Sequence, residues 1–259
     1  MNKKILCPLL CCLALFSACD NTSEDERQTV EISAKHTVLL EEYAGQYCRY
    51  CPRAANYVSQ LKSVLKERLI VVTIHVGSLA SDSLRSSAGE MYFRRFGGAY
   101  LPSGTIDRAA ISGEIINDDD SQWGYYVKKR AEQQDLPDVE LQLESSFNAA
   151  DSTISVYAVT SGTASGFTPR LQLYLTESHI TGFQYTESGI EQNYEHNHIL
   201  RDALNGTWGE EVELNKEYNR TFSVLKGKSW NKDNLSIVGF IYNADTDEVL
   251  YATEISLGD

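Results

Sequence analysis

Two different periods of hydrophobic and polar positions succeed one another along the chain. Between residues 38 and 134, short runs rich in β-branched residues alternate with stretches whose apolar residues recur every three to four positions. The first pattern is typical of strands buried on both faces, and the second of helices that bury one face. We expect strands at 38–43, 69–76 and 104–108, a hairpin return through 111–116, and helices at 51–68, 83–96 and 123–134.

This order of elements predicts the fold of residues 35–136. A strand, a helix, a strand and a helix are followed by a hairpin and a closing helix, and Gly97 and Gly98 end the second helix. Alternating strands and helices of this kind favour an α/β domain. The particular order is that of a thioredoxin-like domain.

From Leu136 onward the period changes to two. Val139, Leu141 and Leu143 alternate with polar residues, and about six or seven segments repeat this alternation up to Ile255. Short alternating strands separated by turns are typical of antiparallel sandwiches. We therefore expect an all-β, sandwich-like domain over residues 137–259, with Pro137 at the boundary. Residues 177–217 fit the alternation least and are expected to form an extended loop.

The N-terminus has the features of an export signal. Lys3 and Lys4 precede an apolar run over residues 5–18, which is too short to span a bilayer. The run ends in small residues before Cys19, and residues 15–19 resemble a bacterial lipobox, in which cleavage precedes a lipidated cysteine. We expect a signal peptide at 1–18 and lipid on Cys19. The alternative is an ordinary signal peptide with an incidental cysteine.

Residues 19–34 are then expected to hold the folded part away from the membrane. Residues 20–28 carry four carboxylates and almost no apolar side chain, a composition typical of flexible linkers. The acidic run 23–26 also looks like the surface-export signals of Bacteroidetes lipoproteins. A linker without an address is the equal alternative.

Charge and motifs exclude several classes of partner. The formal net charge of −13 argues against nucleic acid, whose binding depends on basic groups that neutralise phosphates. The chain has no glycine-rich phosphate loop, dinucleotide fingerprint or serine-nucleophile motif. We expect neither a nucleotide cofactor nor any other cofactor. The membrane is expected as a partner only through the lipid anchor.

Cysteine counting isolates one pair. Three of the six cysteines lie in the expected signal peptide and Cys19 would carry lipid, so Cys48 and Cys51 alone remain. In an oxidising compartment each is the other's only disulfide partner. Two cysteines without two more do not make a four-cysteine zinc site, and we expect no metal.

The spacing Cys48-Arg49-Tyr50-Cys51-Pro52 lies where a strand gives way to a helix. A helix N-terminus stabilises a thiolate, and Arg49 and Arg53 add positive charge, so Cys48 is expected to be the attacking thiol. Cys51 would resolve the mixed disulfide, and proline suits the first helical turn. The alternative is a static disulfide, although a loop this small gains little stabilisation from one.

Several segments resemble one known family. Residues 38–43 and 45–52, residues 98–108 and residues 195–201 are similar to the Bacteroidetes outer-membrane lipoproteins called the twenty-eight-kilodalton outer membrane protein family. The resemblance implies a thioredoxin-like domain followed by a β-rich domain, and an outer-membrane location, on the periplasmic or the exposed side. It implies no particular substrate. Tyr47 stands where thioredoxins usually have tryptophan.

The same resemblance aligns Pro102 with the cis-proline that lies beside the thioredoxin dithiol and presents the substrate backbone. Cis peptide bonds occur mainly before proline. We therefore expect a cis bond at Pro102, with an ordinary trans loop proline as the alternative.

Further polar residues have two interpretations each. Glu42 either accepts the proton of the buried cysteine or faces solvent, and His75 is either a proton shuttle or, more simply, a strand-capping histidine. His196 and His198, next to Glu195, suggest a metal site on paper. A hydrogen-bonded loop explains them better, because no further ligand is identifiable.

These observations together predict an envelope lipoprotein with thiol–disulfide exchange activity on protein thiols or disulfides, through Cys48 and Cys51 with Pro102 beside them. The alternative is a surface binding or adhesion lipoprotein whose β-rich domain binds a partner and whose disulfide is structural. The exposure of Cys48 distinguishes the two, because an exchange enzyme needs an accessible sulfur.

Overall fold

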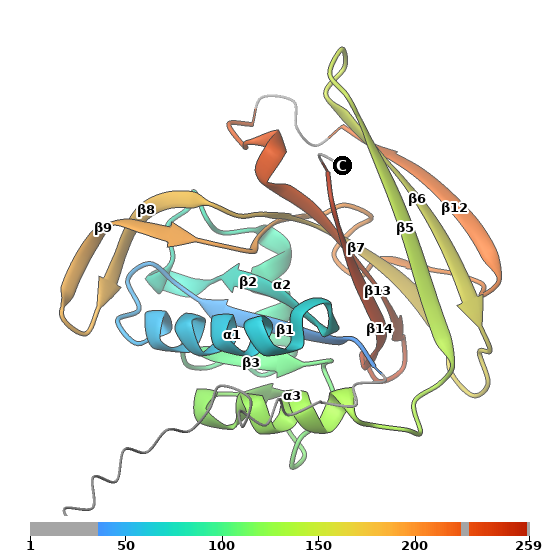
Figure 1. The fold of residues 1–259 in the computed structure, drawn as a ribbon, viewed down its shortest axis with the longest axis horizontal. Helices are drawn as coiled ribbons and strands as arrows, with labels where there is room; N and C mark the ends of the chain where they lie inside the picture. The colour runs from blue at the N-terminus through green and yellow to red at the C-terminus, as the bar shows by residue number, and fades with distance from the viewer. Residues whose placement is uncertain (1–35, 224–227, 258–259) are drawn as a thin grey trace, which may run out of the picture. The chain divides into compact units, whose positions relative to one another are not determined.

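The first half of the chain builds the helix-covered part of a large mixed sheet (Figure 1). The computed structural model describes residues 36–223 and 228–257. Strand β1 (Val38–Ala44) runs parallel to β2 (Leu69–His75) and antiparallel to β3 (Ser103–Ile106), which pairs with the short β4 (Ile116–Asn117). The helices are α1 (Cys51–Leu65), α2 (Ser87–Arg95) and α3 (Trp123–Ala131).

Helices cover both faces of these strands, which explains why β1 and β2 are apolar on both faces. Ala54 and Val58 of α1 and Trp123 of α3 pack in one core with Leu40 of β1. Tyr92 of α2 packs on the other face, in a second core with Leu39 and neighbouring residues of β2. The burial of alternate side chains on opposite faces of a strand thus creates two cores.

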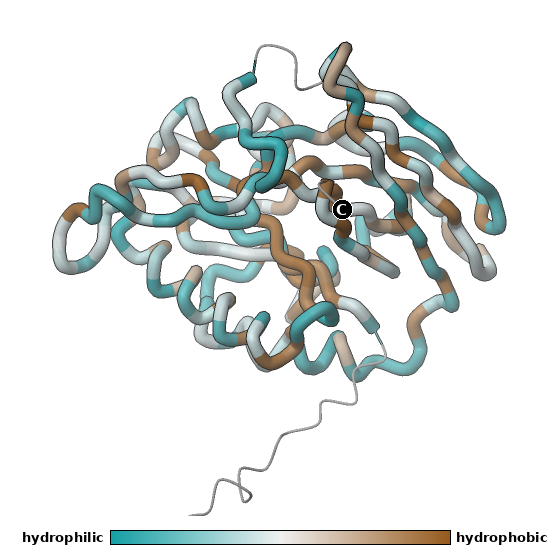
Figure 2. Tube along the Cα trace, turned by 45° about the horizontal axis from the view of Figure 1, so that its top comes forward, coloured by the Kyte–Doolittle hydropathy of each residue, from teal (hydrophilic) through white to brown (hydrophobic). Residues whose placement is uncertain are grey.

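The second half adds strands to the same sheet and forms a smaller sheet opposite it. The inner faces of these two layers pack through Leu141, Val156, Leu173 and Ile237 (Figure 2 shows the hydrophobic residues gathered on the central strands). Such burial of alternate side chains contributes about 25 cal/mol per Å² of apolar surface. The nine-stranded sheet includes β7 (Pro169–Glu177), β13 (Leu235–Asn243) and β14 (Val249–Ser256). The three-stranded sheet consists of β5 (Val139–Asn148), β6 (Thr153–Gly162) and β12 (Lys216–Phe222).

Strand β10 (Ile199–Ala203) joins the strands of the two halves. It pairs antiparallel with β7 and, at Ile199 opposite Thr73, parallel with β2. The resulting strand order is β14-β13-β7-β10-β2-β1-β3-β4, with the short β11 (Glu210–Glu211) paired to β7. The sheet therefore continues across Pro137, and the described residues lie within one compact unit. The division into domains at Pro137 stays a prediction.

A buried ion pair reinforces this junction. Arg108 donates two hydrogen bonds to Glu41 of β1, at 2.7 and 2.8 Å, and a third to the hydroxyl of Tyr174 on β7. The guanidinium also lies 4.9 Å from the ring centre of Phe240 on β13. An aromatic face attracts a cation, and a buried charge needs such partners. Arg108 thus ties the two halves together from the inside.

The structure corrects the expectation of an extended loop at 177–217. This segment contains β10, β11, the first residues of β12, and a two-stranded hairpin formed by β8 (Ile180–Thr186) and β9 (Gly189–His196). Most residues of β9 are exposed, so the alternation that marks a half-buried strand is missing from its sequence. The expected return strand at 111–116 is also shorter, because only Ile116 and Asn117 pair with β3.

Within the described residues, no helix has both the length and the apolar character that crossing a membrane requires.

Candidate functional site

Cys48 and Cys51 form a disulfide at the start of α1, with their Cα atoms 5.5 Å apart. The helix begins at Cys51 with Tyr50 as its N-cap, so Cys48 precedes the helix rather than beginning it. The backbone N–H of Cys51 nevertheless donates to the sulfur of Cys48 at 3.2 Å. Pro52 occupies the first turn, as predicted. The N–H of the first helical residue therefore faces the sulfur of Cys48, where the N-terminus of the helix favours negative charge.

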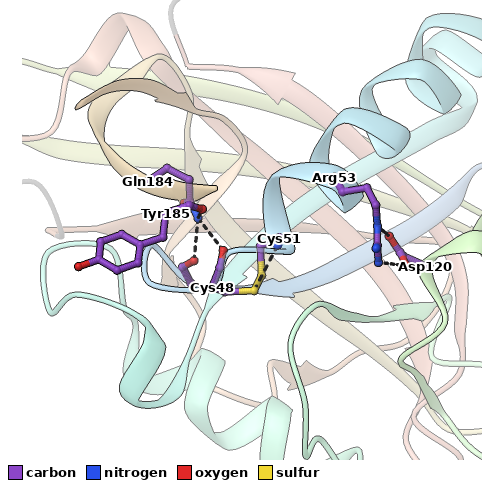
Figure 3. The surroundings of a disulfide bond; sticks show 7 residues. Cys48, Cys51, Arg53, Asp120, Gln184 and Tyr185 are labelled. Atoms are coloured by element: carbon purple, nitrogen blue, oxygen red, sulfur yellow. Dashed lines mark hydrogen bonds and ion pairs between the residues drawn. A yellow bond between two sulfur atoms is a disulfide. The ribbon is translucent and has the colours of Figure 1, made fainter. Parts of the chain in front are cut away.

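The two arginines contribute less charge than the sequence suggests. The exposed side chain of Arg53 makes a two-pronged ion pair with Asp120, with nitrogen–oxygen distances of 2.8 and 3.0 Å (Figure 3). This pairing raises the pKa of Arg53, and it also compensates the positive charge near the disulfide. Arg49 is exposed. The main electrostatic support for a thiolate at Cys48 is therefore the helix N-terminus.

Pro102 has the expected cis conformation, and its neighbour Leu101 lies against the disulfide. The Leu101–Pro102 peptide bond is cis. Leu101 packs against a small buried cluster that consists of Ala44, Cys48 and Cys51. The loop before β3 therefore brings the cis-proline segment against the disulfide, as the family resemblance implies.

A side chain from the second half of the chain covers the disulfide turn. The amide of Gln184, in the middle of β8, donates to the carbonyl oxygens of Cys48 at 3.0 Å and Gly45 at 3.1 Å (Figure 3). The backbone N–H of Tyr185 donates to the carbonyl of Gln46 at 2.8 Å. Cys48 and Cys51 are each only 4% exposed. The β8–β9 hairpin thus restricts access to the pair.

Aromatic contacts hold the hairpin on this turn. The ring of Tyr47 lies 5.2 Å from that of Phe183 and 5.4 Å from that of Tyr185, centre to centre. Tyr47 remains 41% exposed, and Figure 3 shows the ring of Tyr185 turned away from the disulfide. Tilted and edge-on aromatic pairs contribute about 0.5–1.5 kcal/mol beyond area burial. Tyr47 therefore packs against the hairpin.

Below the hairpin a cavity of about 610 Å³ lies between α1, β1, β2 and β9. Cys51 lines it, whereas Cys48 does not. Glu42 also lines it and is 1% exposed, which selects the inward-facing alternative for this residue. Burial raises the pKa of Glu42 to about 8, and Asp120 adds to the rise. A carboxyl group with such a pKa is suited to proton transfer near neutral pH.

His75 lines the same cavity and is buried, with its ring 5.5 Å from that of His196. Burial lowers the pKa of His75 to about 3, and His196 and Arg201 lower it further. The imidazole is therefore neutral at physiological pH. Its Nδ1 has no hydrogen-bond partner among the described residues, so it does not cap the strand through that atom.

His196 and His198 border the cavity without forming a metal cluster. His196 Nε2 lies 3.3 Å from the carbonyl oxygen of Phe183, and His198, with a φ of 57°, follows the end of β9. Burial lowers the pKa of His198 to about 4. In the described part of the chain, no three His, Cys, Asp or Glu side chains are placed to hold an ion. Cys19 and the other residues of the expected signal and tether lie outside the described residues.

Sequence reasoning missed the residues that the hairpin brings to the site. Gln184 is a polar residue in a strand with weak alternation, and its hydrogen-bond partner Cys48 is 136 positions away. Thr73, which donates to Glu42 at 3.5 Å, lies within an apolar strand. A polar residue inside an apolar run was the available signal for Thr73. No comparable signal marked Gln184.

The chain was compared with known families, curated proteins and solved structures. The model of the family described as "Outer membrane protein Omp28" matches residues 90–258, more than half of the chain. No curated protein matches the chain in sequence. Among solved structures, HBP35 of Porphyromonas gingivalis has a TM-score of 0.71 at 16% identity, and the match covers 88% of this chain and 77% of that one. This likeness concerns the fold alone.

Two other structures are similar over different lengths. A protein from Agrobacterium tumefaciens has a TM-score of 0.51 at 16% identity, covering 86% of this chain and 95% of that one. A domain of the outer membrane lipoprotein Omp28 from Porphyromonas gingivalis is 26% identical, with a TM-score of 0.35, over 46% of this chain and 94% of that one.

Proposed function

Since the chain belongs to the Omp28 family of outer membrane proteins, we propose that it is a lipid-anchored envelope protein that exchanges disulfides through Cys48 and Cys51. The protein is located at the outer membrane. Lipid on Cys19 would anchor it there, as the lipobox-like residues before this cysteine predict. The matched family segment begins at residue 90, after both cysteines. The exchange activity therefore rests on the geometry of the disulfide.

One observation carries the proposal. The disulfide lies at the N-terminus of α1, and the segment of cis-Pro102 packs against it through Leu101. A thioredoxin-like arrangement of the first half agrees with this: β1 leads to the disulfide, α1 follows, and β2 lies parallel to β1. Strand β3, which directly follows Pro102 and pairs antiparallel with β1, is the next element of this arrangement. The thioredoxin-like domain is part of the proposal.

The surroundings support a redox cycle. A thiolate on Cys48 would be stabilised by the N–H of Cys51, which points at its sulfur. In the reduced protein, the thiol of Cys51 would pass its proton to the Glu42 carboxylate, which lines the same cavity. The raised pKa of Glu42, about 8, lets this group both take up and release a proton near neutral pH. Both thiols would then be available to a partner disulfide.

A second function is supported by a different observation. The pair is only 4% exposed, and Gln184 covers the carbonyl of Cys48. An inaccessible disulfide fits a surface binding or adhesion lipoprotein whose disulfide is structural. In that case the β-rich half would bind the partner.

The reduction potential of the pair tests the first function against the second. The mature protein is equilibrated with dithiothreitol or glutathione redox buffers, and the reduced fraction is measured by alkylation and mass. We expect a potential between about −270 and −120 mV, the range of exchange proteins. A potential below about −300 mV would support the structural disulfide and contradict exchange. The Cys48→Ser/Cys51→Ser double variant provides the alkylation blank.

A further inference from the structure

The two sulfurs of the disulfide have different surroundings. Cys51 lines the cavity of about 610 Å³ between α1 and β9, and Cys48 does not. The turn that contains Cys48 is held by Gln184 from the hairpin on one side, and Leu101 packs on the buried pair. Accessibility decides which sulfur of a disulfide is attacked. Both cysteines are 4% exposed, but only Cys51 borders a cavity, so a small molecule in that cavity approaches the pair from the side of Cys51.

Two buried polar groups of the cavity lack partners within the described chain. These are Glu42 Oε1 and His75 Nδ1, each on a residue that is at most 3% exposed. Buried polar atoms are normally hydrogen-bonded, so unpartnered ones that line a cavity point to a polar occupant. A carboxyl group and a neutral imidazole are suited to hold the hydrogen-bonding groups of a small molecule.

Size and charge restrict the class of this molecule. A cavity of about 610 Å³ admits a small ligand and excludes a folded protein. Glu191 and Glu195 line its exposed side. Lys62 also lines it, but its amine donates to the carbonyl of Leu69 at 3.0 Å and lies 3.6 Å from Glu254. Glu195 lies 3.3 Å from the imidazole of His179, whereas Glu191 has no such partner among the described residues, so the lining keeps a negative charge that favours a ligand with an amine.

From these observations we infer that a small aminothiol enters this cavity and attacks the sulfur of Cys51, with Cys48 as the leaving group. This inference rests on the proposed exchange function and names its substrate class. It also places the mixed disulfide on Cys51, whereas the sequence predicts Cys48 as the attacking thiol, which would carry the mixed disulfide, and Cys51 as the residue that resolves it.

The step is balanced in atoms and electrons. The ligand thiol loses its proton to the ionised fraction of Glu42, and the thiolate forms a bond with Cys51 Sγ. The Cys48–Cys51 bond breaks, and its electron pair remains on Cys48 Sγ. The N–H of Cys51, which already donates to this sulfur, stabilises the thiolate that leaves. A second aminothiol, as its thiolate, attacks the ligand sulfur of the mixed disulfide. This releases a small disulfide and leaves the electron pair on Cys51 Sγ, which takes up the proton that the second thiol lost. A better-stabilised leaving thiolate accelerates exchange.

Adduct mapping tests the order of attack. The oxidised mature protein is mixed with excess cysteamine, quenched with acid, treated with N-ethylmaleimide and digested with trypsin. Cleavage after Arg49 places the two cysteines in different peptides. We expect cysteamine on the peptide of Cys51 and maleimide on that of Cys48. The reverse assignment would overturn the inference and leave the exchange function intact. Absence of any adduct, while urea-unfolded protein reacts, would contradict the exchange function itself.

A larger side chain in the cavity tests whether cysteamine reaches the disulfide through it. Ala55 lies one turn after Cys51 on α1 and lines the cavity, whereas Gln60 is exposed on the same helix and does not. Ala55→Phe should slow opening of the disulfide by cysteamine about tenfold, and Gln60→Phe should change it less than about twofold. Equal rates in both variants would exclude the cavity as the route. Far-UV circular dichroism verifies that both variants fold.

A matched pair of thiols tests the class of ligand. At equal thiolate concentration and low salt, cysteamine should open the wild-type disulfide several-fold faster than 3-mercaptopropionate, because only the former carries an amine. Glu191→Gln/Glu195→Gln should reduce this ratio. An unchanged ratio in the double variant, or faster reaction with the carboxylate, would contradict an aminothiol site.

Discussion

The side-chain amide of Gln184 donates to the backbone carbonyl of Cys48 at 3.0 Å, across 136 positions of sequence. The same nitrogen lies 3.1 Å from the carbonyl oxygen of Gly45. A single residue of the second half therefore holds both the beginning and the end of the turn that leads to the disulfide. The hairpin that carries Gln184 is consequently part of the site.

Removal of the Gln184 amide should loosen the β8–β9 hairpin over the disulfide. Gln184→Ala removes the amide donor from the carbonyl oxygen of Cys48, whereas that of Gly45 keeps the N–H of Cys48, and we expect a loss of about 1–3 kcal/mol in the free energy of unfolding. After reduction, iodoacetamide should modify Cys48 several-fold faster than in the wild type, because the hairpin no longer covers the turn. Gln192→Ala, on the exposed strand β9, is the control and should change neither quantity. Unaltered alkylation of Cys48 in Gln184→Ala would mean that the hairpin does not limit access.

Glu42 should make the stability dependent on pH in an unusual direction. Burial raises its pKa from 4.5 to about 8, a rise to which Asp120 adds and which the hydrogen bond from Thr73 opposes. Tyr194, His75 and Cys51 line the same cavity. Between about pH 4.5 and pH 8 the native state binds this proton and the unfolded state does not. Stability from this group therefore falls by about 1.4 kcal/mol per pH unit as the pH rises, and it is constant above and below that window.

Urea unfolding of Glu42→Gln measures this contribution. The variant cannot ionise at this position, so it should be more stable than the wild type at pH 8.5 by several kcal/mol, on the order of 1.4 per unit of the pKa rise. The difference should shrink toward zero as the pH approaches 4.5. Glu67→Gln, an exposed residue in the turn after α1, is the matched control. A difference between Glu42→Gln and wild type that does not vary with pH would contradict the prediction.

Part of the fold was predictable because its sequence signals are local. Val38 to Tyr43 is an apolar run because helices cover both faces of β1, and Ala54, Val58 and Leu65 have helical spacing because α1 buries one face. The cis bond at Pro102 agrees with the family resemblance. The expected loop at 177–217 was wrong because β9 is stabilised by pairing with β8 and contributes almost no apolar side chain to a core.

The candidate site was predictable to the same extent. Cys48 and Cys51 have a motif signal and form a disulfide, and Leu101, whose peptide bond to Pro102 is cis, packs against that pair. The sequence did not determine whether Glu42 is buried or exposed, because alternation in a strand that is buried on both faces does not distinguish one face from the other. The cover by Gln184 was not predictable, because it depends on a contact between distant segments.

Loss of Arg108 should destabilise the protein more than loss of a surface arginine. Arg108→Met leaves Glu41 charged and buried without its partner, so we expect a loss of about 3–5 kcal/mol. Glu41→Leu/Arg108→Met should recover part of this loss, because the unpaired charge is also removed. Arg220→Met breaks a partly exposed pair with Glu210 and should cost less than about 1 kcal/mol. Chemical unfolding of the four proteins decides this, and equal losses for Arg108→Met and Arg220→Met would contradict it.

The lipid anchor has a direct test. Cys19→Ala should abolish labelling by a palmitate analogue and release the protein from the membrane fraction, because the thiol that carries the lipid is absent. Cys12→Ala, within the expected signal peptide, should label as the wild type does. Persistent labelling of Cys19→Ala would exclude this residue as the lipidation site.

The hairpin over the disulfide also has a consequence in time. A chain is made from its N-terminus, so Cys48 and Cys51 exist before residues 180–196 and before Ile199 can pair with Thr73. Pairings between such distant positions form late, because their loop-closure entropy must be overcome first. We therefore expect nascent chains that end before residue 180 to present both thiols to an oxidant, and alkylation of such truncated chains should be fast. Folding would then close the hairpin over a disulfide that has already formed.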